Sequence, residues 1–176
     1  MTKSILKKRG QVWVETVIYT LIGLAIIGIL LGATKPRIEE IKDKSLIEQS
    51  IESLNLIHEK VFEVTRGKGS RQILGLEISK GQFYIDGKTD SIYWILDTSY
   101  LYSEPGETIS VGDVEITLEE ENEIMNITLK TNYSSFNITY SGGDNIKFFE
   151  KGAVPYEISV ENQGGEDKIV INFEEV

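Results

Sequence analysis

The chain has 176 residues, a net charge of −10 from 18 basic and 28 acidic residues, no cysteine and one histidine. The lack of cysteine excludes disulfides, thiolate nucleophiles and cysteine-ligated metals, and a single histidine leaves no histidine cluster for a metal and no conventional catalytic triad. The acidic balance argues against a nucleic-acid partner, because that affinity depends on clustered lysine and arginine. We therefore expect neither an enzyme nor a protein with a bound cofactor.

Apolar residues concentrate near the N-terminus. From Val12 to Ala33, 16 of 22 residues are hydrophobic, and Thr16 to Thr34 contains no charged residue. At about 1.5 Å per residue, this uncharged run would form a helix about 28 Å long, close to the thickness of the bilayer hydrocarbon. More basic residues precede the segment than follow it closely: Lys3, Lys7, Lys8 and Arg9 against Lys35 and Arg37. The positive-inside rule thus places the N-terminus in the cytoplasm and the rest of the chain outside.

Three interpretations of this segment compete: a secretory signal peptide, a permanent single-pass anchor, and a prepilin-type leader whose apolar part stays with the protein. A secretory signal is disfavoured because its apolar core is shorter, about 7 to 15 residues, and because Leu31 stands where a small residue should precede a cut after Ala33. An anchor explains the length and orientation but gives Glu15 no role. An acidic residue in a membrane region is a functional candidate by default, unless it lies at the level of the lipid headgroups.

The residues around Glu15 resemble a known family. A basic leader ends in Lys8-Arg9-Gly10, Gln11 follows, and glutamate is the fifth residue after the glycine, at the start of the apolar run. This pattern resembles the class III signal peptide of archaeal type IV pilin-like proteins. The resemblance implies that a membrane prepilin peptidase cuts between Gly10 and Gln11 and removes residues 1–10.

The resemblance also implies a mode of assembly. The new α-amino group of Gln11 could pair with Glu15 of a neighbouring subunit, and such a pair in apolar surroundings would fix the register between subunits. Gly28 and Gly32 form a small-xxx-small pair that lets helices approach closely, although glycine is also frequent in membrane helices in general. The family further implies a pilus assembly ATPase and a membrane platform protein as partners, a precursor in the cytoplasmic membrane, and an extracellular filament as the product.

A second helical pattern continues beyond Pro36 to about residue 64. Its apolar residues recur at three, four or six positions, with charged residues between them: Ile38, Ile41, Ile47, Ile51, Leu54, Ile57 and Val61. We expect one long helix over residues 11–66, with a membrane or filament-core part at about 12–34 and an amphipathic part at about 36–64 that packs on the head. His58 lies at the border of the apolar stripe and is expected to be a partly exposed structural residue. Gly67-Lys68-Gly69 is expected to cap the helix and form a turn.

From Arg71 onward, short alternating runs separated by turn signals predict an all-β head over residues 70–176. Nine strands are expected: Gln72–Ser79, Gln82–Asp86, Ser91–Leu96, Thr108–Leu118, Glu123–Thr131, Ser135–Tyr140, Asn145–Phe149, Tyr156–Glu161 and Lys168–Phe173. This number of short strands favours a β-sandwich or barrel. The predicted fold class is α+β, with a long N-terminal helix followed by a sandwich-like head, which is also the pilin-like arrangement.

Three N-x-S/T sequons lie within fourteen residues of the predicted head, at Asn126, Asn132 and Asn137. Alternation places Asn126 and Asn137 opposite the apolar faces of their strands, so both should face outward, as a glycan acceptor must. We expect N-linked glycans here, with an unmodified polar strand face as the alternative.

The acidic residues of the head show no EF-hand spacing, so a solvated face is preferred to a calcium site: Asp86, Asp90, Asp97, Asp113, Glu115, Glu119 and Glu120.

The sequence therefore predicts a structural subunit of an archaeal type IV pilus-like extracellular filament, in which copies of the chain bundle their N-terminal helices and serve surface adhesion. A membrane-tethered binding or adhesion module, or a minor pilin that does not itself form the filament, is the alternative. An exported enzyme is the least favoured class.

Overall fold

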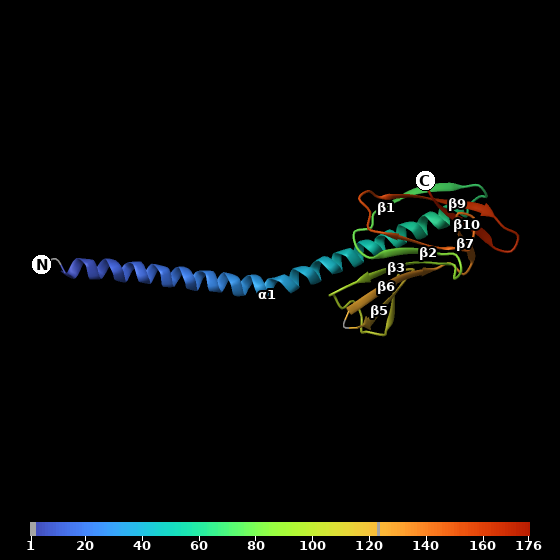
Figure 1. Ribbon diagram of the computed structural model, residues 1–176. Helices are drawn as coiled ribbons and strands as arrows, with labels where there is room; N and C mark the ends of the chain where they lie inside the picture. The colour runs from blue at the N-terminus through green and yellow to red at the C-terminus, as the bar shows by residue number, and fades with distance from the viewer. Residues whose placement is uncertain (1–2, 123) are drawn as a thin grey trace. The chain divides into compact units, whose positions relative to one another are not determined.

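The computed structural model describes residues 3–122 and 124–176, and side chains from Val12 onward. One helix, α1, precedes the β-strands (Figure 1). The chain divides into two compact units, and the boundary along the chain lies between Ile41 and Lys42. The elements are α1 (Lys3–Val64), β1 (Arg71–Leu76), β2 (Gln82–Asp86), β3 (Ser91–Asp97), β4 (Thr108–Val111), β5 (Val114–Glu121), β6 (Ile124–Asn132), β7 (Phe136–Tyr140), β8 (Ile146–Glu150), β9 (Tyr156–Gly164) and β10 (Ile169–Glu175).

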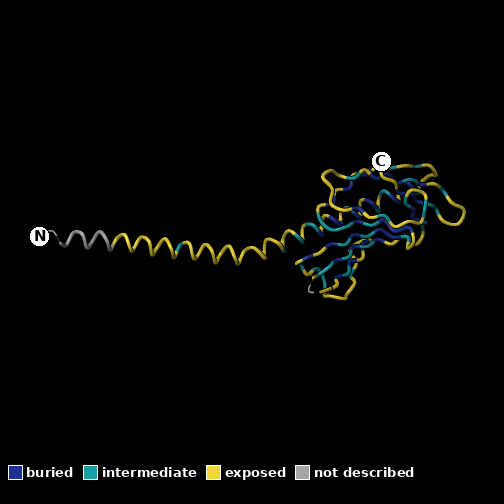
Figure 2. The backbone as a smooth tube through the Cα atoms, viewed as in Figure 1, coloured by how far each residue is buried: buried dark blue, intermediate teal, exposed yellow. Residues whose placement is uncertain are grey.

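The part of α1 in the first unit is an apolar helix without a covering layer. It contains Pro36, and the helix continues on both sides of this residue. From Val12 to Ile41 nearly all side chains are exposed (Figure 2), including the apolar ones. The helix is long and apolar enough to cross a membrane. It begins at Lys3, whereas the predicted start at residue 11 marked an expected cleavage site rather than a helix end.

In the second unit, α1 buries one face. Its buried apolar side chains follow helical spacing: Ile47, Ile51, Leu54, Ile57, Val61 and Val64. The predicted apolar stripe is therefore confirmed from Ile47 onward. Its first two members, Ile38 and Ile41, are 50% and 68% exposed, because they precede the unit that contains the sheets.

The strands form two sheets, with orders β1-β9-β10-β7 and β4-β5-β6-β3-β2-β8. The pair β7–β10 is parallel and the other neighbouring pairs are antiparallel. Side chains from both sheets and from the buried face of α1 belong to one hydrophobic core. The α+β fold with a β-rich head is thus confirmed, but the helix is part of the core of the head, so the two sheets do not pack on each other alone.

One predicted strand is wrong. The segment Thr108–Leu118 forms two strands, β4 and β5, which pair as a hairpin with Val111 opposite Val114. Gly112, in the two-residue loop, has a φ of 63°, a value that glycine adopts without the steric cost that a side chain brings. The sequence contains the signal, because the apolar positions change from odd to even numbers at Gly112-Asp113. The other eight predicted strands are present with boundaries shifted by up to three residues, and the predicted start at Glu123 lies outside the described residues.

Candidate functional site

Glu15 lies on the exposed surface of the apolar part of α1. The hydroxyl groups beside it are satisfied within the helix, since Thr16 donates to the Val12 carbonyl and Thr20 to the Thr16 carbonyl, both at 2.9 Å. Among the described side chains, Glu15 forms no ion pair. The predicted cleavage site, Gly10 and Gln11, lies outside the residues whose side chains are described.

Gly28 and Gly32 leave a part of the helix backbone uncovered. A Cβ atom placed on either residue would meet nothing within 4 Å. The two positions are four apart, so they lie one above the other on the same helix face. A face of this kind leaves room for another helix, and the role of Gly28 and Gly32 in assembly stays a prediction.

The first two sequon asparagines lie on or beside the outer face of the six-stranded sheet. Asn126 is half-buried in β6, between Asp97 and Glu119 on the neighbouring strands. Asn132 ends β6 and is exposed, and its Nδ2 donates to Oε2 of Glu115 at 2.8 Å. Asn132 is therefore open to solvent, although strand alternation had selected the other two acceptors.

The third sequon is less accessible than alternation suggested. Asn137 in β7 is half-buried, and Thr139 of the same sequon is 4% exposed and donates to Oδ1 of Asn172 at 3.0 Å. Ile138, on the opposite side of the strand, is also buried. Both sides of β7 are buried here, because Ile138 lies in the hydrophobic core and Thr139 is covered through its contact with Asn172.

A polar clamp fixes the start of the buried part of α1. Asp43 accepts hydrogen bonds from Lys80 Nζ at 2.8 Å and from the amide and hydroxyl of Ser99 at 2.7 and 2.8 Å. Lys80 Nζ also lies 3.1 Å from Oδ2 of Asp97. Burial alone would raise the pKa of Asp43, but the hydrogen bonds from Lys80 and Ser99 outweigh it and hold that pKa below its usual value.

Two acidic residues expected on a solvated face instead accept hydrogen bonds from other parts of the head. Asp86 is 6% exposed and accepts hydrogen bonds from the amides of Lys88 and Thr89 and from the Thr89 hydroxyl. Asp90 accepts from the amide of Ile138 at 2.9 Å, at the edge of the four-stranded sheet. The turn between β2 and β3 uses the Asp86 carboxylate as the acceptor for its backbone donors, which explains why the prediction of a solvated face is wrong for Asp86. Asp90 instead joins this turn to the edge strand β7.

His58 is partly exposed, as predicted, and lies in an aromatic cluster. Its Nε2 is 3.4 Å from Oδ2 of Asp113 in the β4–β5 loop, and its ring centroid is 4.6 Å from that of Phe62 and 5.6 Å from that of Tyr133. His58 Nδ1 and the Tyr133 hydroxyl are buried without a hydrogen-bond partner among the described residues. Burial, together with the charge of Asp113, raises the pKa of Tyr133. The cluster holds the β4–β5 hairpin against α1.

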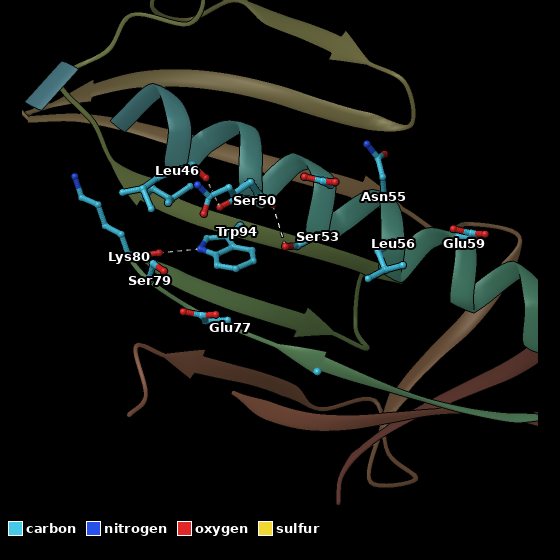
Figure 3. A pocket seen from close by; sticks show the side chains of 14 residues that line it. Leu46, Ser50, Ser53, Asn55, Leu56, Glu59, Glu77, Ser79, Lys80 and Trp94 are labelled. Atoms are coloured by element: carbon cyan, nitrogen blue, oxygen red, sulfur yellow. Dashed lines mark hydrogen bonds between the residues drawn. The ribbon is translucent and has the colours of Figure 1, made fainter. Parts of the chain in front are cut away.

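A groove of about 590 Å³ lies between α1 on one side and the end of β1, the segment that follows it and β3 on the other (Figure 3). Residues from α1, among them Glu52, Leu56 and Glu59, line one side, and Gly75 and Glu77 line the other. Trp94 of β3 also lines the groove and donates from Nε1 to the Lys80 carbonyl at 3.1 Å. The sequence analysis missed this groove because its residues come from three separate elements and form no local motif.

Among the described residues, no group of three or more histidine, cysteine or acidic side chains could hold a metal ion. Comparisons with protein-family models, curated proteins and solved structures find no significant match to the chain.

Proposed function

We propose that the chain is the structural subunit of an extracellular filament of the archaeal type IV pilus-like class, with the apolar N-terminal helices bundled inside, the β-rich heads outside, and a role in surface adhesion. The observation that carries the proposal is the continuity of α1. The same helix has a part whose large apolar side chains are all exposed, from Val12 to Leu31, and a part that is built into the core of the head. In a filament, contacts between the exposed helix parts of neighbouring subunits would therefore also link their heads, because each head contains the second part of the same helix.

The precursor would sit in the cytoplasmic membrane before assembly, with its head outside. Prepilin peptidase would cut between Gly10 and Gln11, and the assembly ATPase and platform protein would move the subunit out of the bilayer. Such a machine is needed because lipid tails and neighbouring helices are equally apolar, which leaves little driving force for extraction.

The full chain can be tested in an archaeal host that contains a prepilin peptidase. Intact-protein mass spectrometry should show a start at Gln11, and electron microscopy should show filaments that disappear when the gene is removed. A chain that keeps residues 1–10 in the presence of active peptidase would overturn the proposal.

The Glu15→Ala variant tests the assembly step separately. We expect normal cleavage but loss of filaments, because removing one partner of a buried ion pair costs about 3 to 5 kcal/mol. Glu39→Ala is the matched control, since Glu39 is an exposed glutamate on the same helix beyond the apolar segment. Normal filaments from the Glu15→Ala variant would contradict the assigned role.

A membrane-tethered binding module is the second candidate, and the groove between α1 and β1 is the observation that favours it. Cleavage at Gly10 without filaments under the same conditions, with the chain retained in the membrane, would favour this alternative or a minor pilin.

A further inference from the structure

The strand β1 has a free edge beside the groove. It pairs with β9 on one side, and no described strand pairs with its other side. Unpaired edges expose backbone donors and acceptors, and proteins usually protect them with charges, proline or bulges. Gly75, within β1, is exposed and lines the groove, and a Cβ atom placed on it would meet nothing within 4 Å. Among the described residues, only β9 forms backbone hydrogen bonds with β1, so the backbone groups at its other edge have no partner in the chain.

The groove beside this edge combines an apolar surface with negative charge. Leu56 is 45% exposed on the helix side. The carboxylates of Glu52, Glu59 and Glu77 are exposed and form no ion pair among the described residues. The nearby cation, Lys80, is already paired with Asp43 and Asp97. The charge in the groove that has no ion-pair partner among the described residues is therefore negative.

From these features we infer that the groove binds an extended peptide segment of another polypeptide, whose residues alternate between apolar and basic, as an added strand on β1. The peptide backbone pairs with the free edge, which supplies affinity independent of sequence, and alternate side chains reach the groove, which supplies specificity. Apolar side chains contact Leu56, and lysine or arginine side chains meet the unpaired carboxylates. This inference does not depend on filament formation.

The probe is the acetylated and amidated hexapeptide Lys-Val-Lys-Val-Lys-Val, added to the full-length chain in detergent micelles with ¹⁵N-labelled glycine. We expect the amide signal of Gly75 to shift and the hydrogen exchange of β1 to slow. A fully N-methylated version of the peptide keeps the side chains but cannot donate backbone hydrogen bonds, so it should not bind. An unshifted Gly75 signal, or equal binding of the N-methylated peptide, would overturn the inference.

A double charge reversal, Glu52→Lys with Glu77→Lys, tests the electrostatic part. The reversal replaces two attractive exposed contacts with repulsive ones, so it should weaken peptide binding about tenfold. Glu48→Lys is the matched control, because Glu48 is exposed on the same helix but does not line the groove. Its affinity should stay within about twofold of the unmodified chain. Circular dichroism confirms that the variants fold, and unchanged affinity in a folded double variant would contradict the assigned ligand class.

Discussion

At the scale of single residues, Asp43 has an unusually complete set of partners. Both of its carboxylate oxygens accept hydrogen bonds, one from Lys80 and the other from the amide and hydroxyl of Ser99. Its side chain is 12% exposed, so solvent screens these contacts only in part. The clamp joins α1 to the segment that precedes β2 and to the segment that follows β3. Asp43 thus ties the helix to the six-stranded sheet.

The Asp43→Asn variant should lower the free energy of unfolding by about 2 kcal/mol at pH 7, because hydrogen bonds to a charged group are lost. The folded-state pKa of Asp43 is lowered, so its contribution is present above the unfolded pKa of about 3.9 and is lost as the pH falls through the folded value. In urea denaturation in detergent, the stability difference between the two chains should therefore be constant well above the unfolded pKa of about 3.9 and should shrink as the pH falls below it. Glu48→Gln is the control, since its contact with Lys44 is long, at 3.9 Å, and exposed. A pH-independent difference would contradict the ionic origin.

Tyr133 differs from Asp43, because its polar group lacks a hydrogen-bond partner among the described residues. Its hydroxyl is buried and has no partner among the described residues, and an unmade hydrogen bond costs about 1 to 3 kcal/mol. The Tyr133→Phe variant should therefore be as stable as the unmodified chain or more stable, by up to about 1 kcal/mol. In Tyr156→Phe, by contrast, a 3.0 Å bond to the Glu150 carbonyl is lost, and stability should fall slightly. Thermal unfolding of the two variants compares them directly. A clear loss of stability in Tyr133→Phe would reveal a bound water or another partner for this hydroxyl.

At the scale of elements, local pattern was a good guide wherever one face of an element meets the core. The stripe from Ile47 to Val61 and eight of the nine expected strands follow from periods of 3.6 and 2. The burial of Thr139 did not follow, because its hydroxyl is bonded to Asn172 of β10, 33 residues further along the chain, and no local period encodes that pairing. The groove was missed for the same reason, since Leu56, Gly75 and Trp94 meet only after the chain has folded.

The β4–β5 hairpin gives a test at this scale. Gly112 has a φ of 63°, so Gly112→Ala should destabilise the head by about 1 kcal/mol through backbone strain. Gly67→Ala is the control, because Gly67 does not have a positive φ and a Cβ atom there would meet nothing within 4 Å. Chemical denaturation should separate the two variants by about that amount. If they are equally stable, the hairpin does not constrain this position.

At the scale of the whole molecule, the helix is shared between two compact units of the chain. Up to Ile41 it forms a compact unit of its own, and from Lys42 it shares a unit with both sheets. The expected head, residues 70–176, contains the strands but omits the six buried apolar side chains of the helix, from Ile47 to Val64. Burial of each such side chain contributes about 1.5 to 3 kcal/mol, so together they are worth about as much as the net stability of a typical domain.

Two truncated chains test this division. A fragment of residues 42–176 keeps the whole core and lacks the exposed apolar segment, so it should be soluble without detergent and unfold cooperatively. A fragment of residues 70–176 contains all the described strands but exposes the apolar surface that α1 covers, and it should aggregate or stay unfolded. Circular dichroism and size-exclusion chromatography distinguish these outcomes. A stable, monomeric 70–176 fragment would show that the sheets need no helix, whereas recovery of its fold on adding a peptide of residues 42–66 would demonstrate that the helix completes the head.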